Sequence, residues 1–224
     1  MVIRTKYSTP EPIRRASLYD SYKFVLDDLA EAEKRLDKEE DAYSNEYITS
    51  AAAQALHARV ALYMQDWDTA IEYASILIDE KKSTFKLADA KTKYNADYTF
   101  FDYMWAYDLS YEIIWRIGFT ETSYGSPLGT VFLNFTKDLT YYYPDYVPAT
   151  AALNLYDAAD LRYSGYFAGK EQGLTIGYTN GLDWPMLVKY YGNRNLIANQ
   201  IYHVSMPKPF RLAEQYLILS LIHI

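Results

Sequence analysis

The stretch HARVALYMQDWDTAIEYASILI, residues 57–78, decides the fold because two helical patterns meet in it. One amphipathic pattern ends at the letters QDWD and the next begins there, with a very short turn between them. Asp66 is a good N-cap for the second helix, which we predict to run to about Glu80. Helices joined this closely pack antiparallel, so the sequence predicts a helical hairpin.

Helical spacing predicts the faces of this hairpin. The first helix has alanines that permit close approach of a neighbour, and an apolar stripe that we expect to face the second helix. We also expect Trp67, at the start of the second helix, and Trp115, in an alternating apolar segment, to lie in the core. The residues expected to pack across the hairpin are Leu56, Val60 and Tyr63 on the first helix and Trp67, Ala70, Ile71 and Ala74 on the second.

The rest of the chain is less regular. A helix is predicted before the hairpin in RASLYDSYKFVLDDLAEAEKRL, with Ser17 as its N-cap. Residues 94–146 are rich in aromatic residues and turn signals, so we predict loops there, with one extended piece at EIIWRI, residues 112–117. A short helix is predicted in ATAALNLYDAADLR, ending near Asp160, and a last helix begins in PFRLAEQYLI.

Composition narrows the classes of function. Half of the 224 residues are apolar, which is enough to bury a sizeable core. The 29 acidic and 22 basic side chains give a formal net charge of -7, which repels a phosphate backbone and argues against nucleic acid as a partner. Cysteine is absent, which excludes disulfides, thiolate metal sites and a cysteine nucleophile. No stretch reaches the roughly 18–20 apolar residues that a membrane-spanning helix needs.

The polar residues give no catalytic constellation. The histidines are scattered, and His57 is interpreted as a packing residue of an alanine-rich helix. Carboxylate pairs lie on expected helix faces and loops, where solvated charge is the better interpretation. Arg59 is interpreted as structural, and Asp160 with Arg162 as an ion pair or a backbone cap. We therefore predict no catalytic residue, no metal site and no cofactor.

Aromatic side chains are the candidates for a binding site. The chain has 25 Tyr, 4 Trp and 9 Phe, and such rings can stack on the apolar faces of sugars while nearby polar groups bind the hydroxyls. Several of them, in the irregular region, lack a helical stripe or lie beside Gly or Pro in turns. These site candidates are Tyr103, Trp105, Tyr107, Tyr124, Tyr142 and Trp184.

Several motifs follow one another in a recognisable order. The strongest is AAAQALHARVALYMQDW, residues 51–67, and the others are YEIIWRI, LNLYDAADLR, LVKYY and RLAEQYLI. In this order they resemble the SusD/RagB family of outer-membrane nutrient-binding lipoproteins over residues 15–218. The segment DWDTAIEYA also resembles the second helix of a tetratricopeptide repeat, in a degenerate form.

The resemblance implies a mainly α fold in which tetratricopeptide-like helical hairpins carry an irregular, loop-rich ligand-binding region. Residues 1–82 would form the helical repeat scaffold, and residues 83–210 the aromatic binding region with short helices. Residues 211–224 would begin a further scaffold helix, with an expected non-native tail from Leu219. The chain thus resembles an internal fragment that lacks the N-terminal lipidated part and the C-terminal part of the family.

The resemblance also implies a function at the outer membrane of Bacteroidota. Family members are anchored to the cell surface by lipid, cover a SusC-like TonB-dependent transporter, and deliver oligosaccharides to it, or peptides in some lineages. On this interpretation the chain binds starch or another glycan for nutrient uptake, is not an enzyme, and meets the membrane only through an anchor absent from this sequence. Two alternatives stay open: a helical-repeat peptide-binding scaffold, which would need further regular repeats, and a glycoside hydrolase, which would need two carboxylates in one cleft.

Overall fold

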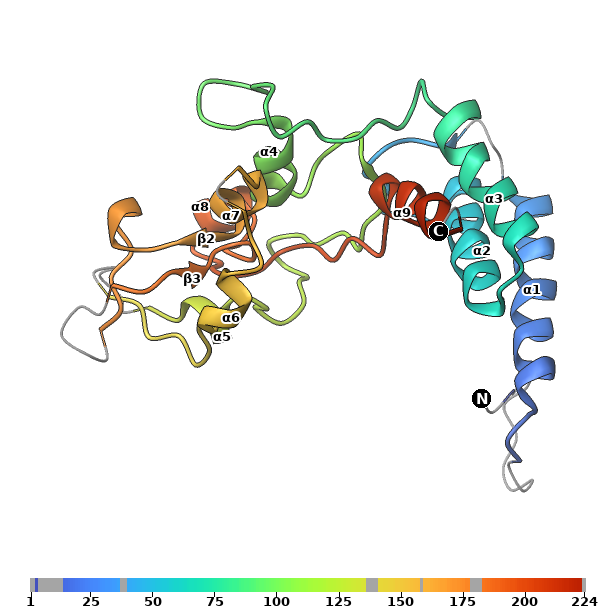
Figure 1. Ribbon diagram of the computed structural model, residues 1–224, viewed down its shortest axis with the longest axis horizontal. Helices are drawn as coiled ribbons and strands as arrows, with labels where there is room; N and C mark the ends of the chain where they lie inside the picture. Colours follow the sequence, from blue (N-terminus) through green and yellow to red (C-terminus); the bar gives the residue numbers. More distant parts are fainter. Residues whose placement is uncertain are drawn as a thin grey trace. The chain divides into compact units, whose positions relative to one another are not determined.

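The computed structural model describes residue 3 and residues 14–36, 40–135, 141–157, 159–177 and 183–222. The chain divides into two compact units. The first consists of Met1–Leu87, Tyr111–Arg116 and Lys208–Ile224, and the second of Ala88–Ser110 and Ile117–Pro207. Over the described residues the chain is mainly helical with short strands, which confirms the mainly α class that the sequence predicted (Figure 1). In the same ranges, no helix has the length and apolar character needed to cross a membrane.

Helices that pack side by side build the first unit. They are α1 (Leu18–Arg35), α2 (Ser50–Met64), α3 (Trp67–Ser75) and α9 (Leu212–Ile222), with a π-helical turn η2 (Ile76–Glu80) that continues α3. Helix α2 contacts both α1 and α3, and α9 contacts α3. An antiparallel strand pair, β1 (Ile113–Trp115) with β4 (Phe210–Arg211), completes the unit, so the predicted extended piece is confirmed.

Local signals explain where these helices begin and end. The N–H of Asp20 donates a hydrogen bond of 3.0 Å to Ser17 Oγ, which confirms Ser17 as the N-cap of α1. Gln65 ends α2 in the left-handed conformation, with φ 60°. The N–H of Thr69 donates to Asp66 Oδ1 at 3.4 Å, so the predicted cap of α3 is confirmed and only Gln65 and Asp66 separate the two helices.

The α2–α3 hairpin packs through alanines. Ala58 and Ala61 of α2 lie against Ala70 and Ala74 of α3, and Ile218 of α9 joins the same cluster. All four alanines are fully buried. Their small side chains let the two backbones approach closely, which leaves no space for larger residues between them.

The hairpin itself is confirmed, and so are Ala70 and Ala74 on the contact face of α3, but the predicted contact face of α2 is wrong. Val60 packs toward α1, against Leu29. Tyr63 and Trp67 are 72% and 44% exposed, so Trp67 is not the core residue that the sequence predicted. The larger residues of α2 were expected to face α3, but the alanines of α2 face it.

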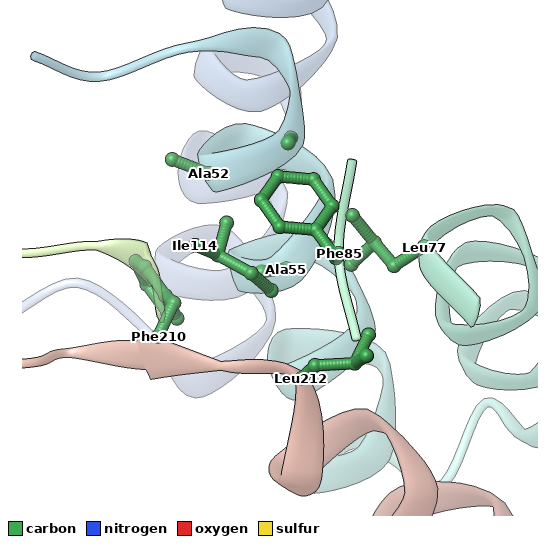
Figure 2. Packing of buried hydrophobic residues seen from close by; sticks show 8 residues of the cluster. Ala52, Ala55, Leu77, Phe85, Ile114, Phe210 and Leu212 are labelled. Atoms are coloured by element: carbon green, nitrogen blue, oxygen red, sulfur yellow. The ribbon is translucent and has the colours of Figure 1, made fainter. Parts of the chain in front are cut away.

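Apolar side chains from several segments meet in the core of the first unit (Figure 2). Phe85, which follows η2, is buried among residues of α2, η2, β1 and β4. The ring of Trp115 stacks on that of Phe210 with centroids 5.9 Å apart, so Trp115 packs against this core as predicted. The buried cluster consists of Ala51, Ala52, Ala55, Leu77, Phe85, Ile114, Phe210 and Leu212.

His57 is a packing residue, as the sequence predicted. Its ring stacks on Tyr73 with centroids 3.8 Å apart, and its Nδ1 lies 2.9 Å from Glu33 Oε1. The Tyr73 hydroxyl donates to the other oxygen of Glu33 at 3.1 Å. Burial, together with the nearby Glu33 carboxylate, raises the pKa of Tyr73 to about 12. His223 lies outside the described residues.

Short elements and connecting segments build the second unit. They include α4 (Phe100–Tyr107), α5 (Thr130–Leu133), α6 (Thr150–Leu153), α7 (Leu161–Tyr166), η3 (Lys170–Gln172) and α8 (Arg194–Ala198). The strands β2 (Phe167–Ala168) and β3 (Met186–Leu187) pair antiparallel, with Phe167 opposite Leu187. A small core gathers around this pair, from Leu133, Tyr142, Ile176 and Met186.

Asp160 begins a helix, whereas the sequence predicted a helix that ends near it. Helix α6 stops at Leu153, and α7 starts after Asp160, whose Oδ1 accepts the N–H of Arg162 at 2.9 Å. The Arg162 guanidinium also donates to Asp160 Oδ2 at 2.6 Å. The interpretation of this pair as an ion pair and backbone cap is confirmed, and the predicted single helix is wrong.

Candidate functional site

Helix α4 positions a group of aromatic side chains in a segment that the sequence predicted to be loop-like. That prediction is wrong for Phe100–Tyr107, because a capping box starts a helix there. The N–H of Asp102 donates to Thr99 Oγ1 at 3.1 Å, and the Asp102 carboxylate accepts from the Thr99 N–H and hydroxyl. Side chains four residues apart then share a face. These pairs are Phe101 with Trp105 and Tyr103 with Tyr107.

One face of α4 carries a tyrosine cluster. The rings of Tyr103 and Tyr107 stack with centroids 4.5 Å apart, and Tyr94 lies against Tyr103 at 3.9 Å. Tyr98 meets the edge of Tyr107 at 5.6 Å. Burial and a hydrogen bond with Tyr94 raise the pKa of Tyr103. Since these rings cover one another, the cluster chiefly supports the segment that leads into α4.

The other face of α4 carries Trp105 in an aromatic cage. The Trp105 ring meets Tyr166 and Tyr190 edge to face, with centroids 5.9 and 6.4 Å away. The Lys189 ammonium lies 4.4 Å from the centroid of Trp105 and 4.7 Å from that of Tyr166. Such a position over aromatic rings is a cation–π contact. This contact holds the Lys189 ammonium against the Trp105 ring.

A pocket of about 140 Å³ lies beside Trp105. Helix α4, helix α7 and the segment 188–194 all contribute to its wall. It combines aromatic surface with a few polar groups, which is the usual composition of a ligand site. The side chains that give it this character are Tyr98, Asp102, Trp105, Lys189, Tyr191 and Arg194.

Two glycines explain why these segments can meet. A Cβ on Gly165 would lie 3.3 Å from Phe101 Cε1, a tight contact that a larger residue could make only if the Phe101 ring shifted slightly, so glycine favours the close approach of α7 to α4. Gly192 has φ 118°, and a Cβ there would lie 2.9 Å from the backbone nitrogen of His203. Glycine adopts such a left-handed conformation without a steric penalty. The turn at Gly192 places Tyr191 and Arg194 in the same wall.

Asn193 holds this turn against the end of α4. Its Nδ2 donates to the carbonyl of Tyr107 at 2.9 Å and to Asp108 Oδ2 at 2.8 Å. Its Oδ1 accepts the N–H of Asn195 at 3.0 Å, which caps α8. Asn193 is 2% exposed, so its hydrogen bonds are protected from water. The position of Arg194 therefore depends on a buried polar anchor.

Arg194 supplies positive charge to the pocket. Its guanidinium carbon lies 4.5 Å from the centroid of Tyr191. Its buried Nε has no hydrogen-bond partner among the described residues. The Tyr191 hydroxyl lies 3.3 Å from that of Tyr142, and burial raises the pKa of Tyr142 well above its ordinary value. The Tyr142 phenol therefore stays protonated at neutral pH.

A second pocket, of about 410 Å³, lies beside β2 and η3. Its wall includes the rings of Tyr163 and Phe167 and the charged side chains of Lys170, Glu171 and Asp183. It therefore contains two carboxylates, whereas the pocket beside Trp105 is lined by the single carboxylate of Asp102. In the described part of the chain, no cluster of three or more His, Cys, Asp or Glu side chains could hold a metal ion.

The structure separates the six aromatic candidates. Trp105 lines the pocket, and Tyr103 and Tyr107 lie in the tyrosine cluster on the opposite face of α4. Tyr142 is 4% exposed and reaches the pocket only through Tyr191. Tyr124 is 48% exposed and lies outside both pockets. Trp184 packs on the cluster around Leu133, with its Nε1 donating to the Pro148 carbonyl at 2.9 Å.

The polar residues of the pocket were missed by the sequence reasoning. Asp102, Lys189 and Arg194 show no periodic pattern, and the fold brings Asp102 together with the other two from about ninety residues away in the sequence. A signal for part of this wall was present in LVKYYGNRN, where tyrosines, a glycine turn and two cations follow one another. The motif LVKYY contributed to the family resemblance but was not assigned to a site.

Comparison with known proteins gives matches among solved structures, whereas no family model and no curated protein sequence matches the chain. A SusD superfamily protein from Bacteroides thetaiotaomicron VPI-5482 matches with a TM-score of 0.69 and 20% identity, over 99% of this chain and 46% of its own. The fold of this chain is SusD-like. The resemblance predicted from the sequence is thus confirmed in structure.

Glycan-binding proteins are among the SusD-like matches. Surface glycan-binding protein A from Bacteroides fluxus matches with a TM-score of 0.61 and 20% identity, over 94% of this chain and 48% of its own. The protein of the same description from Bacteroides thetaiotaomicron, in complex with laminarihexaose, matches with a TM-score of 0.59 and 17% identity, over 90% of this chain and 49% of its own. The chain spans about half the length of the solved proteins it matches.

Proposed function

We propose that this chain is part of a cell-surface glycan-binding protein and that its second unit binds an oligosaccharide. The observation that carries the proposal is the pocket in which the ring of Trp105 meets Asp102, Lys189 and Arg194. SusD-like neighbours described as surface glycan-binding proteins, one of them in complex with laminarihexaose, support it.

The proposed mode of binding follows from the chemistry of a sugar ring. A pyranose presents apolar C–H groups that pack against an aromatic side chain, and hydroxyls that need hydrogen-bond partners. In the pocket, Trp105 offers the aromatic surface, and the Asp102 carboxylate can accept while Lys189 and Arg194 can donate. The remaining rings, Tyr98 and Tyr191, extend the surface on which neighbouring sugar units would lie.

The helices of the first unit are proposed to be the tetratricopeptide-like scaffold, with the α2–α3 hairpin as one repeat. The sequence resemblance then suggests that the complete protein is held at the outer-membrane surface by lipid and passes its ligand to a SusC-like TonB-dependent transporter. Both the anchor and the transporter belong to the proposal.

Binding without cleavage is part of the same proposal. Hydrolysis of a glycosidic bond normally needs two carboxyl groups, separated by about 5–10 Å, in one site. The pocket beside Trp105 has a single carboxylate, Asp102, which already accepts hydrogen bonds as the helix cap. Because its Oδ2 accepts both hydrogen bonds from Thr99 and no second carboxylate lines this pocket, it is a poor candidate for a general acid or nucleophile.

A glycan panel tests the proposal. The full chain would be titrated calorimetrically with laminarihexaose, maltohexaose, cellohexaose, xylohexaose and an oligogalacturonate, with a peptide library as the comparison class. The proposal expects saturable binding of at least one oligosaccharide and none of the peptides. Binding of peptides alone would favour the helical-repeat peptide scaffold and contradict the proposal.

A further inference from the structure

The pocket beside Trp105 has an unbalanced charge. Lys189 and Arg194 contribute two cations to its wall, and Asp102 contributes one carboxylate. The pocket is therefore locally positive in a chain whose formal net charge is -7.

Among the described residues, the charge of Arg194 has no partner of opposite charge. Its guanidinium carbon lies 4.5 Å from the centroid of the Tyr191 ring, and among the described residues no carboxylate forms an ion pair with it. Its Nε is buried without a hydrogen-bond partner in those residues. An incompletely satisfied, half-buried guanidinium gains most from a ligand group that carries negative charge.

The guanidinium is also held in place before any ligand binds. The neighbouring Asn193 anchors the segment to the end of α4 through hydrogen bonds of 2.9 and 2.8 Å, and the Tyr191 ring supports the guanidinium itself. A planar guanidinium matches the two oxygens of a carboxylate. A pre-positioned guanidinium loses less conformational entropy when it binds such a group.

We infer that the ligand of this pocket is an acidic oligosaccharide, in which a sugar carboxylate pairs with Arg194 while a ring of the same chain packs against Trp105. This inference rests on the proposed glycan-binding function and names its substrate class. The pocket, at about 140 Å³, is smaller than the roughly 300–1,000 Å³ of a pocket for a drug-sized ligand, so it would hold one acidic sugar of a longer chain.

The test compares one oligosaccharide in two charge states. Hexagalacturonate and its fully methyl-esterified form have the same sugar backbone, but only the first carries carboxylates. Both would be titrated calorimetrically into the full chain at low and at physiological salt. The inference expects the acid to bind about 10- to 100-fold more tightly than the ester, as for a charge-assisted hydrogen-bonded pair, with a smaller difference at higher salt.

Substitutions at Arg194 then test whether this residue causes the preference for the acid. Arg194→Gln should lower the affinity for the acid much more than the affinity for the ester, so that the preference for the acid is lost, while Arg194→Lys should retain part of the preference. Arg162→Gln is the matched control, because Arg162 belongs to the same unit, pairs with Asp160 and lies outside the pocket. The wild-type comparison of acid and ester decides the question even where a variant fails to fold.

The outcomes separate the two proposals. Equal affinity for acid and ester, or an acid preference that Arg194→Gln leaves intact, overturns the inference about the acidic ligand and leaves glycan binding standing. A chain that binds neither form, and none of the neutral oligosaccharides of the panel, overturns the proposed function itself.

Discussion

The guanidinium of Arg59 forms a bidentate ion pair with the carboxylate of Glu214, with nitrogen–oxygen distances of 2.5 and 2.6 Å. The same guanidinium donates to the Pro209 carbonyl at 2.6 Å and lies 4.4 Å from the centroid of Phe210. Arg59 comes from α2 and Glu214 from α9, in the two sequence motifs that most strongly indicated the fold. The pair therefore joins the hairpin to the last helix, and the structural interpretation of Arg59 is confirmed.

Glu214→Gln should destabilise the first unit, because it leaves the half-buried guanidinium without its anion. Charged hydrogen bonds contribute about 1.5–3 kcal/mol each, so we expect the free energy of unfolding in urea to fall by roughly 1–3 kcal/mol. Asp27→Asn, which breaks an exposed pair with Lys23 on α1, is the matched control and should cause no measurable change. Equal effects of the two substitutions would show that the Arg59–Glu214 pair contributes nothing beyond surface charge.

The alanine interface of the hairpin predicts that larger side chains at these positions destabilise the fold. Ala70 of α3 is fully buried against α2 and α9. Ala70→Trp should therefore overpack this interface and lower the free energy of unfolding by about 1–3 kcal/mol or more. Glu72→Trp, on the exposed side of α3, should leave the stability nearly unchanged. Thermal denaturation of both variants is the measurement, and an unchanged melting temperature for Ala70→Trp would mean that this face is open.

Burial of His203 predicts a pH dependence of stability. Burial lowers the pKa of His203 below its ordinary value of about 6.5, so the unfolded chain binds a proton more readily than the folded one. The contribution is fully present above pH about 6.5 and is lost as the pH falls through the folded pKa. His203→Asn removes the titration, and asparagine tolerates the positive φ of 62° at this position.

The measurement is urea unfolding from about pH 7.5 to about pH 5, a range that spans the ordinary pKa of histidine. The wild-type chain should lose more stability over this range than His203→Asn. Parallel pH profiles for the two proteins would show that His203 does not titrate differently on folding.

The helical part of the fold could be predicted from the sequence because its signals are local. Ser17 and Asp66 cap helices as expected, and the two-residue connection fixes the α2–α3 hairpin. The face of α2 that contacts α3 is not determined by local signals. Ala58 and Ala61 are buried against α3 because they allow close approach, and the larger Val60 packs against α1, which only the three-dimensional arrangement of three helices decides.

The aromatic segment and the site were harder to predict for a different physical reason. Helix α4 has aromatic residues on both faces, so it lacks the single apolar stripe on which the periodicity argument depends. The capping box of Thr99 and Asp102 was the available signal for its start. The charged wall of the pocket depends on the close approach at Gly165 and on the anchor Asn193, and neither contact leaves a pattern in the sequence.

We predict that the purified chain hydrolyses no oligosaccharide of the panel. Two carboxylates line the second pocket, Glu171 and Asp183, and a glycosidase would need such a pair in one site. The check is a reducing-end assay on the wild-type chain, with Glu171→Gln and Asp183→Asn as comparisons. Product formation that either substitution abolishes would move the protein to the hydrolases.

The most direct test of the central claim is the affinity of Trp105→Ala for the tightest-binding oligosaccharide of the panel, measured by calorimetry. Loss of the aromatic surface should weaken binding by about 1–3 kcal/mol, by analogy with stacking of bases on aromatic side chains, whereas Trp105→Phe should retain part of the affinity. Trp67→Ala, at an exposed tryptophan of the first unit, is the matched control and should bind like the wild type. If Trp105→Ala binds as tightly as the wild-type chain, the glycan site does not lie in this pocket and the account is contradicted.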